Sequence, residues 1–193
     1  KDVALVCSDA RVGAVAGCLG GTSTITNVTV ENVTGATAII GGDYDKGEAV
    51  AAKIGDTYYA SFKSAFDAAK AGDEIVLLAP VVVAKGETLT LDKAVTITYT
   101  SNVAGEDMIT VRGTLNVDGA ALVYTNTDTT AVNVTVSTIS CEPGSVLEVK
   151  SGSVKNDSAN NAVNQIYAYA IDLLTNGNLG DVTATISGGE VIS

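Results

Sequence analysis

The chain has 193 residues, of which 46% are hydrophobic and only 5% aromatic, and it contains neither Trp nor His. Its formal net charge of -11, with 11 Lys and Arg scattered along the sequence, argues against binding to nucleic acid or to an anionic membrane surface. The longest apolar run, 75–84, contains Pro80 and is shorter than the roughly 20 residues of a membrane-spanning helix, so we expect no membrane insertion.

The composition also indicates the fold class. The apolar residues are mainly Val, Ala and Ile, and Thr is frequent, which favours pleated, half-buried strands. Twenty Gly and two Pro are typical of tight corners between short strands. The sequence therefore predicts an all-β protein.

The first 48 residues contain related short motifs. A stretch of small and apolar residues at 12–17 is echoed at 38–42, and the segment 24–33 between them alternates like a strand. This pattern resembles the GLUG-type repeats of bacterial surface proteins, in which a Gly-Gly-hydrophobic element precedes a Thr-x-x-Asn strand. We therefore expect 1–48 to be a small β-repeat segment at the end of an array, joined by the polar stretch 43–49 to a second module, 49–193.

A short helix is predicted over 61–71. Ser61 is a suitable N-cap, and Gly72 can adopt the left-handed conformation that ends a helix. Four apolar residues recur at helical spacing and form one stripe: Phe62, Ala65, Phe66 and Ala69. The apolar run 75–78 that follows predicts a strand buried on both faces.

This helix and strand carry a second resemblance, on the residues Ser61, Phe62, Ala65, Phe66, Ala68, Ala69, Gly72, Asp73, Ile75 and Leu77. Their order resembles the start of pectate-lyase-like right-handed parallel β-helices, and 53–78 is similar to stretches of large surface proteins from gut bacteria. The resemblance implies that 61–71 is a capping helix and that 49–193 is a parallel β-helix, or solenoid.

Beyond residue 84 we interpret successive β-branched centres as successive coils of irregular length: Ile97, Val117, Val134, Val149, Ile171 and Ile186. The segment 149–154 recurs at 186–191, which we interpret as an interval of two coils. The polar stretch 156–164 is predicted to be a loop. The chain starts at Lys1 and stops inside the repeating pattern, so we expect an excised piece of a longer protein, truncated at its C-terminus, with an open edge at 191–193 that allows end-to-end stacking.

One acidic turn resembles a calcium loop. Asp43 and Asp45 occupy its first and third positions, and Glu48 is a further oxygen donor, but Gly47 stands where a third ligand is needed. A solvated hinge is the alternative interpretation. No other metal site and no cofactor site is predicted.

Enzymes of the resembled fold use grouped aspartates, or calcium-binding acids together with a Lys or Arg base. No Asp-Asp pair occurs here, and the arginines are Arg11 and Arg112 alone. Strand stacking brings residues that are distant in the sequence together. Candidates for a catalytic site formed across coils are therefore Asp92, Asp107 and Asp118. The alternative is that each occupies a corner and accepts hydrogen bonds from turn amides.

Two further sets of residues are candidates for surface contacts. Tyr167 and Tyr169 alternate on one predicted strand and share a face, so they are candidates for a ligand platform, with core or corner filling as the alternative. Arg112 is expected to pair with Glu106 or Asp107.

The three cysteines are Cys7, Cys18 and Cys141, without a CxxC motif. Their apolar surroundings predict small buried side chains, and a Cys7–Cys18 disulfide is the alternative for the first two. They are too few for a zinc site in a chain without His.

These observations lead to one leading hypothesis. We expect a non-catalytic surface β-solenoid of a secreted or cell-surface bacterial protein, acting as a stalk or adhesin-like module toward host or microbial glycans or surface proteins. The alternative is a carbohydrate-active β-helix, a polysaccharide lyase or glycoside hydrolase, whose active residues converge across coils.

Overall fold

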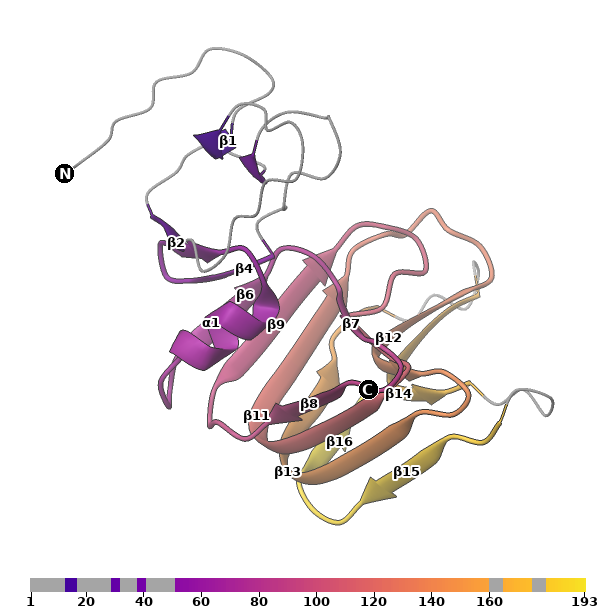
Figure 1. The fold of residues 1–193 in the computed structure, drawn as a ribbon. Coiled ribbons are helices and arrows are strands. Elements are labelled where there is room, and N and C mark those ends of the chain that lie inside the picture. The colour runs from indigo at the N-terminus through magenta and orange to yellow at the C-terminus, as the bar shows by residue number, and fades with distance from the viewer. Residues whose placement is uncertain (1–12, 17–28, 32–37, 41–50, 160–164, 175–179) are drawn as a thin grey trace. The chain divides into compact units, whose positions relative to one another are not determined.

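The computed structural model describes residues 13–16, 29–31, 38–40, 51–159, 165–174 and 180–193. The chain divides into two compact units, Lys1–Ala68 and Ala69–Ser193. The predicted boundary after residue 48 stays a prediction, because the joint at 43–49 lies outside the described residues. Helices and strands are labelled in Figure 1.

The described residues of the first unit form two small groups of strands. β1 (Gly13–Ala16) and β3 (Ala38–Ile40) pair in parallel, and they come from the two stretches that echo each other in the sequence. β5 (Thr57–Tyr59) pairs antiparallel with both β2 (Thr29–Glu31) and β4 (Ala52–Ile54). The strand predicted over 24–33 is thus described at its centre as β2.

The predicted helix is present as α1 (Phe62–Ala68). The Ser61 hydroxyl accepts a hydrogen bond from the Ser64 backbone N–H at 3.1 Å, so Ser61 is the N-cap. The four residues of the predicted stripe are buried, and Gly72 has φ +89°. The stripe and the N-cap are therefore confirmed. The predicted stop is not, because the helix ends at Ala68 and Gly72 lies in the following turn, where its N–H donates to the Ala94 carbonyl at 2.7 Å.

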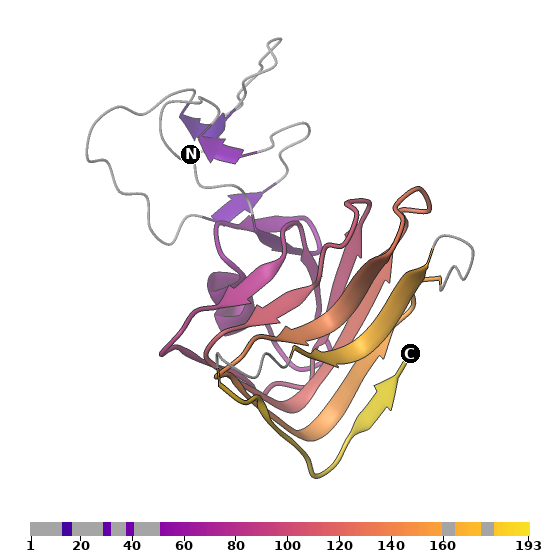
Figure 2. The ribbon, with the colours of Figure 1, turned by 90° about the vertical axis from the view of Figure 1, so that its right-hand side faces the viewer.

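The second unit consists of parallel strands that are linked by turns. Its strands are β6 (Glu74–Leu77), β7 (Val81–Val83), β8 (Thr88–Leu91), β9 (Thr96–Ser101), β10 (Ile109–Val111), β11 (Thr114–Asn126), β12 (Val134–Cys141), β13 (Val146–Asn156), β14 (Ile166–Leu173), β15 (Thr183–Ile186) and β16 (Glu190–Ile192). Every pairing given within this unit is parallel, and β9, β11 and β13 run side by side in Figures 1 and 2. The predictions of an all-β class and of parallel strands are confirmed for the described residues.

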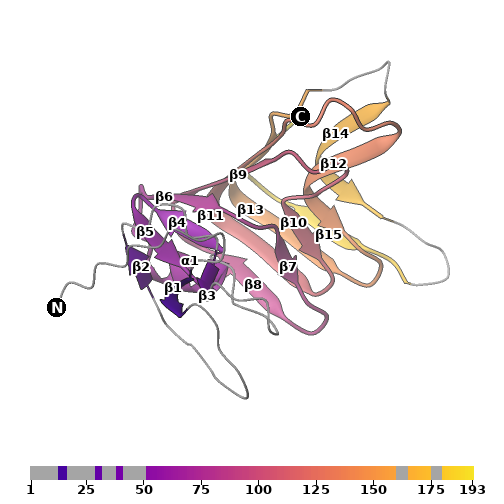
Figure 3. The ribbon, with the colours of Figure 1, turned by 90° about the horizontal axis from the view of Figure 1, so that it is seen from above.

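The strands of this unit stack in three ladders. The first ladder contains β6, β9, the second half of β11, the second half of β13, and β16. The second contains β7, β10, β12 and β14, the last two of which lie side by side in Figure 3. The third contains β8, the first half of β11, the first half of β13, and β15. The chain visits the three ladders in this same order in each repeat.

The paired residues show how the core is built. In the first ladder Ile75, Ile97, Leu122 and Val154 pair in succession, and all four are fully buried. Burial of aliphatic side chains in adjacent repeats is worth about 1.5–3 kcal/mol for each fully buried residue. The stack therefore depends on neighbouring repeats, since no single repeat could cover its own apolar positions.

Two predictions about this unit are wrong. The predicted coil centres mix the ladders: Val117, Val149 and Ile186 pair with one another in the third ladder, so the interval from 149 to 186 is one repeat and not two. The run 75–78 is not buried on both faces, because the side chains alternate and Leu78 is 43% exposed.

Candidate functional site

β14 carries the two tyrosines that the sequence singled out. Tyr167 and Tyr169 are each 43% exposed, whereas Ala168 between them is buried, so both rings stand on the outer face of the strand. Tyr167 pairs with Thr135 and Tyr169 with Ser137 of β12. The prediction that they share a face is confirmed, and their exposure contradicts the alternative of core filling.

Asp107 lies just before β10 and interacts with β12. Its Oδ1 accepts a hydrogen bond from the Ser137 backbone N–H at 2.7 Å. Burial raises the pKa of the Asp107 carboxyl above its usual range; hydrogen bonds from Ser137 and from the Ser140 hydroxyl oppose this rise, and the negative charge of Asp172 adds to it. The carboxyl therefore keeps its proton to a higher pH than an exposed aspartate does.

Asp172 lies on the same part of the sheet. It belongs to β14 and pairs with Ser140, whose hydroxyl also interacts with Asp107. Because Ser137 and Tyr169 are paired residues of parallel strands, their side chains leave the sheet on the same face, and the Asp107 carboxyl lies beside Ser137. We call Tyr167, Tyr169, Asp107 and Asp172 together the tyrosine–aspartate surface.

This surface has two kinds of chemistry. A partly exposed tyrosine ring offers a flat apolar face and a hydroxyl, which suits a ligand with one apolar and one polar side. Ionised carboxylates accept hydrogen bonds from hydroxyl or ammonium groups of a ligand. The combination fits the ring and hydroxyl groups of a sugar. Sequence reasoning missed Asp172, and the pattern around it contains no signal that would have indicated it.

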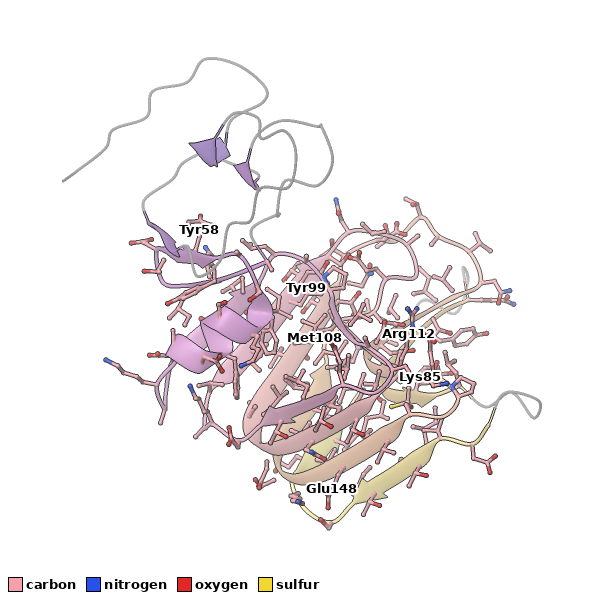
Figure 4. The ribbon with its side chains drawn as sticks, viewed as in Figure 1. Tyr58, Lys85, Tyr99, Met108, Arg112 and Glu148 are labelled. Carbon is pink, nitrogen blue, oxygen red and sulfur yellow. The ribbon has the colours of Figure 1, made fainter. Side chains whose placement is uncertain are left out.

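A second polar cluster lies inside the unit and has a structural role. The Tyr99 and Tyr124 rings stack with centroids 5.7 Å apart, and Tyr99 donates a hydrogen bond to the Glu106 carboxylate at 2.7 Å. Ser101 also donates to that carboxylate, and Tyr124 donates to the Glu106 backbone carbonyl. Burial raises the pKa of Tyr124 to about 12, so this phenol stays protonated at neutral pH. Tyr99 and Met108 lie among the buried side chains in Figure 4.

The three candidate aspartates do not form one cluster. Asp118 accepts a hydrogen bond from the Ser151 hydroxyl at 2.8 Å, and Asp92 is exposed in the turn after β8. The partner of Asp118, a residue of β11, is thus a side-chain hydroxyl and not a turn amide, whereas Asp107 belongs to the tyrosine–aspartate surface. Within the part of the chain that the structure describes, no group of three or more His, Cys, Asp or Glu side chains could hold a metal ion.

The predicted partner of Arg112 is wrong. Arg112 pairs with Glu142, with 2.9 Å between Nε and Oε1, and not with Glu106 or Asp107. The reason is the ladder: Val111 pairs with Cys141, so the next residue of each strand lies side by side. Both side chains are partly exposed, and such a surface pair contributes at most about 1 kcal/mol to stability.

Of the remaining candidates, the cysteines and the calcium-loop acids, only Cys141 lies among the described residues. Cys141 is a fully buried free thiol, as predicted, and burial raises its pKa to about 11. The calcium-loop candidates Asp43, Asp45 and Glu48, together with Cys7 and Cys18, lie outside the described residues.

The comparisons with known proteins add no relative. No protein-family model matches the chain, and no curated protein or solved structure matches it at a significant level. Among the described residues, no helix has both the length and the apolar character needed to cross a bilayer.

Proposed function

We propose that residues 69–193 form a right-handed parallel β-helix. Three parallel ladders visited in constant order support this proposal, because one chain reaches them in turn only by winding round an axis. Parallel strands connected within one sheet are right-handed in about 98% of cases, which supports the proposed hand. A crystal structure with open sheets or left-handed connections would contradict it.

The function that this architecture favours is that of a non-catalytic binding module on a surface solenoid, extracellular or at the cell surface of a bacterium. The observation that carries this proposal is the pair of exposed tyrosines on one face of β14, the strand that also carries Asp172, whose charge acts on Asp107. The ligand class that fits is a glycan, either free or on a surface protein. Antibody labelling of intact cells of the source bacterium tests the location, and labelling that requires cell lysis would contradict it.

A glycan array followed by calorimetry tests the binding function. We expect reproducible binding to a subset of glycans, and loss of that binding in Tyr167→Ala and Tyr169→Ala. Val82→Ala is the matched control, because Val82 is 51% exposed on β7 of the same sheet and should leave binding unchanged. Silence on the array, or equal loss in all three variants, would contradict the proposal and favour a stalk without a ligand site.

One observation favours a second candidate, a carbohydrate-active enzyme. Two carboxyl groups, Asp107 and Asp172, lie close enough for the charge of one to raise the pKa of the other, and glycoside hydrolysis uses a carboxylic acid together with a carboxylate. Incubation with neutral polysaccharides and polyuronides, followed by detection of new reducing or unsaturated ends, tests this function. Activity that survives further purification and is abolished in Asp107→Asn would replace the binding proposal.

A further inference from the structure

One buried amide interrupts an apolar row of the first ladder. Along this row the residues that pair in succession are Leu77, Tyr99, Tyr124 and Asn156, and all four are buried. The first three contribute an aliphatic chain and two rings, whereas Asn156 contributes an amide. A buried amide costs free energy unless its polar atoms are hydrogen-bonded, so this position needs polar partners.

Asn156 has these partners on two other strands. Its Nδ2 donates hydrogen bonds to the backbone carbonyls of Val136 at 2.9 Å and of Tyr169 at 2.8 Å. Its Oδ1 accepts a hydrogen bond from the Ser158 backbone N–H at 2.9 Å. Both hydrogens and the oxygen of the amide are thus used, which fixes the orientation of the side chain. One side chain of β13 therefore joins β12 and β14, which lie side by side in Figure 2.

A second hydrogen bond ties β13 to β12 at the same place. The Thr138 hydroxyl of β12 donates to the backbone carbonyl of Lys155, the residue before Asn156, at 2.8 Å. Each of the two strands thus donates a side-chain hydrogen bond to a backbone carbonyl of the other. These bonds cross from the first ladder to the second, whereas the backbone pairs join strands within one ladder.

The amide of Asn156 does more than cap the loop that follows it. Asn126 ends the preceding strand, β11, and accepts a hydrogen bond from the Asp128 backbone N–H at 2.9 Å, in the same way as Asn156 does in its own loop. The bonds that Asn126 donates go to the Val103 carbonyl at 2.9 Å and to the Tyr124 hydroxyl at 3.0 Å, and neither partner lies on β12 or β14. The loop cap is therefore common to both asparagines, and the bond to β14 distinguishes Asn156.

The β14 carbonyl that Asn156 contacts belongs to an exposed tyrosine. The ring of Tyr169 stands on the outer face, while Ala168 and Ala170 on either side of it are buried. Alanine buries little apolar area, so side-chain packing holds this part of β14 less firmly than it holds strands with Ile or Leu at their buried positions. The hydrogen bond from Asn156 acts on the backbone at this point.

We propose that Asn156 is the positioning residue for Tyr169. Its amide holds the backbone of β14 from inside the unit, so that the rings of Tyr167 and Tyr169 present one surface to a ligand. Asn156 itself touches no ligand, because it is buried, and its effect on binding passes through Tyr169. This inference rests on the proposed binding function, since the position of the ring affects function only where a ligand uses it.

Asn156→Leu tests the proposal, because leucine is close to asparagine in size and suits a row that begins with Leu77, but it donates no hydrogen bond. Asn126→Leu is the matched control, since it removes a buried amide with the same loop cap and without a bond to β14. Asn156→Ser is a second variant in case the leucine variant does not fold. A serine hydroxyl can still accept from the loop, as Ser101 does from the Val103 N–H at 3.0 Å, but its single hydrogen cannot serve two carbonyls.

The first measurement needs no ligand. Carbon NMR of the labelled chain records the backbone carbonyl resonance of Tyr169, which responds to hydrogen bonding, and the line widths of its ring resonances, which respond to motion. We expect both to change in Asn156→Leu and Asn156→Ser and to stay as in the wild type in Asn126→Leu. A general loss of stability would not produce this difference, because the control also removes a buried amide.

The second measurement is binding to the glycan array. We expect at least tenfold weaker binding in Asn156→Leu and less than a twofold change in Asn126→Leu. Tyr169 resonances that respond equally to both leucine variants, or to neither, would overturn the proposal, as would undiminished array binding in Asn156→Leu. A wild-type chain that binds no glycan would refute the binding function instead, and the NMR result would still decide whether Asn156 holds Tyr169 in place.

Discussion

The corner between the third and first ladders provides the sharpest test of the stacked repeats. Gly152 has φ +88°, and a Cβ atom added there would lie 2.1 Å from the backbone carbonyl oxygen of Ala120, one repeat earlier. Gly86 has a similar φ of +84°, but a Cβ atom added there meets nothing within 4 Å. The pair Gly152→Ala and Gly86→Ala therefore separates backbone strain from the contact between repeats.

The two effects have different sizes. A non-glycine residue in the left-handed region costs roughly 1–2 kcal/mol, and this cost applies to both variants. The Gly152→Ala methyl must also displace a backbone carbonyl, and overpacking of this kind adds typically about 1–3 kcal/mol. We therefore expect Gly152→Ala to lose about 1–3 kcal/mol more free energy of unfolding than Gly86→Ala.

Urea unfolding followed by circular dichroism measures both losses on the same chain. The expected result is a lower midpoint for Gly152→Ala than for Gly86→Ala, with an unchanged slope. If the two midpoints agree within error, the backbones of adjacent repeats do not approach closely at this corner, and the ladder register argued above is wrong there.

Three more predictions concern buried polar groups. The pKa of Asp107 is raised in the folded state, so its ionisation lowers the free energy of unfolding as pH rises from about 4. Asp107→Asn should remove this loss in urea unfolding and leave a variant at least as stable as the wild type at neutral pH. Asn156 donates to two backbone carbonyls and is 4% exposed, so Asn156→Ala should cost about 2–3 kcal/mol, against less than about 0.5 for the more exposed Asn116→Ala. Cys141 should resist iodoacetamide at pH 8 until urea unfolds the chain, as peptide mass spectrometry will show, because its pKa is about 11.

The start of the helix could be predicted from the sequence because its signals are local. Ser61 and the apolar stripe lie within one short segment, and the N-cap accepts a hydrogen bond from the Ser64 backbone N–H. The end of the helix could not be predicted in this way, because it lies at Ala68 and the N–H of Gly72 pairs with the distant Ala94 carbonyl.

The length of the repeat could not be predicted in the same way. A β-branched centre has the same sequence pattern in all three ladders. Counting Val134 and Ile171 of the second ladder together with Val117, Val149 and Ile186 of the third therefore gives coils that are too short. Only the pairing of backbones assigns each strand to a ladder, and that pairing joins residues far apart in the sequence.

The same reason explains the outcome for the charged residues. The sequence suggests acids close to Arg112 in the chain as its partners, but the pairing of β10 with β12 places Glu142 of the next repeat beside it. Asp107 could be predicted as a candidate, yet Asp172 reaches it only because Ser140 lies between them on β12. A site that forms across repeats leaves no signal in the spacing of its residues.

The paired residues also indicate where new function can arise in this architecture. The interval between successive partners in the first ladder grows at each step, from Ile75–Ile97 to Ile97–Leu122, then to Leu122–Val154 and Val154–Val191. Part of the added length lies in the second ladder, where β7 and β10 have three residues each and β12 and β14 have eight. β10 pairs only with Ile139–Cys141 of β12, so the earlier residues of β12 extend beyond β10 and pair with β14. Tyr167 and Tyr169 lie in this added part of β14. The exposed tyrosines thus belong to a lengthened pair of strands, whereas the shared residues of the ladder keep the pairing of the shorter repeats.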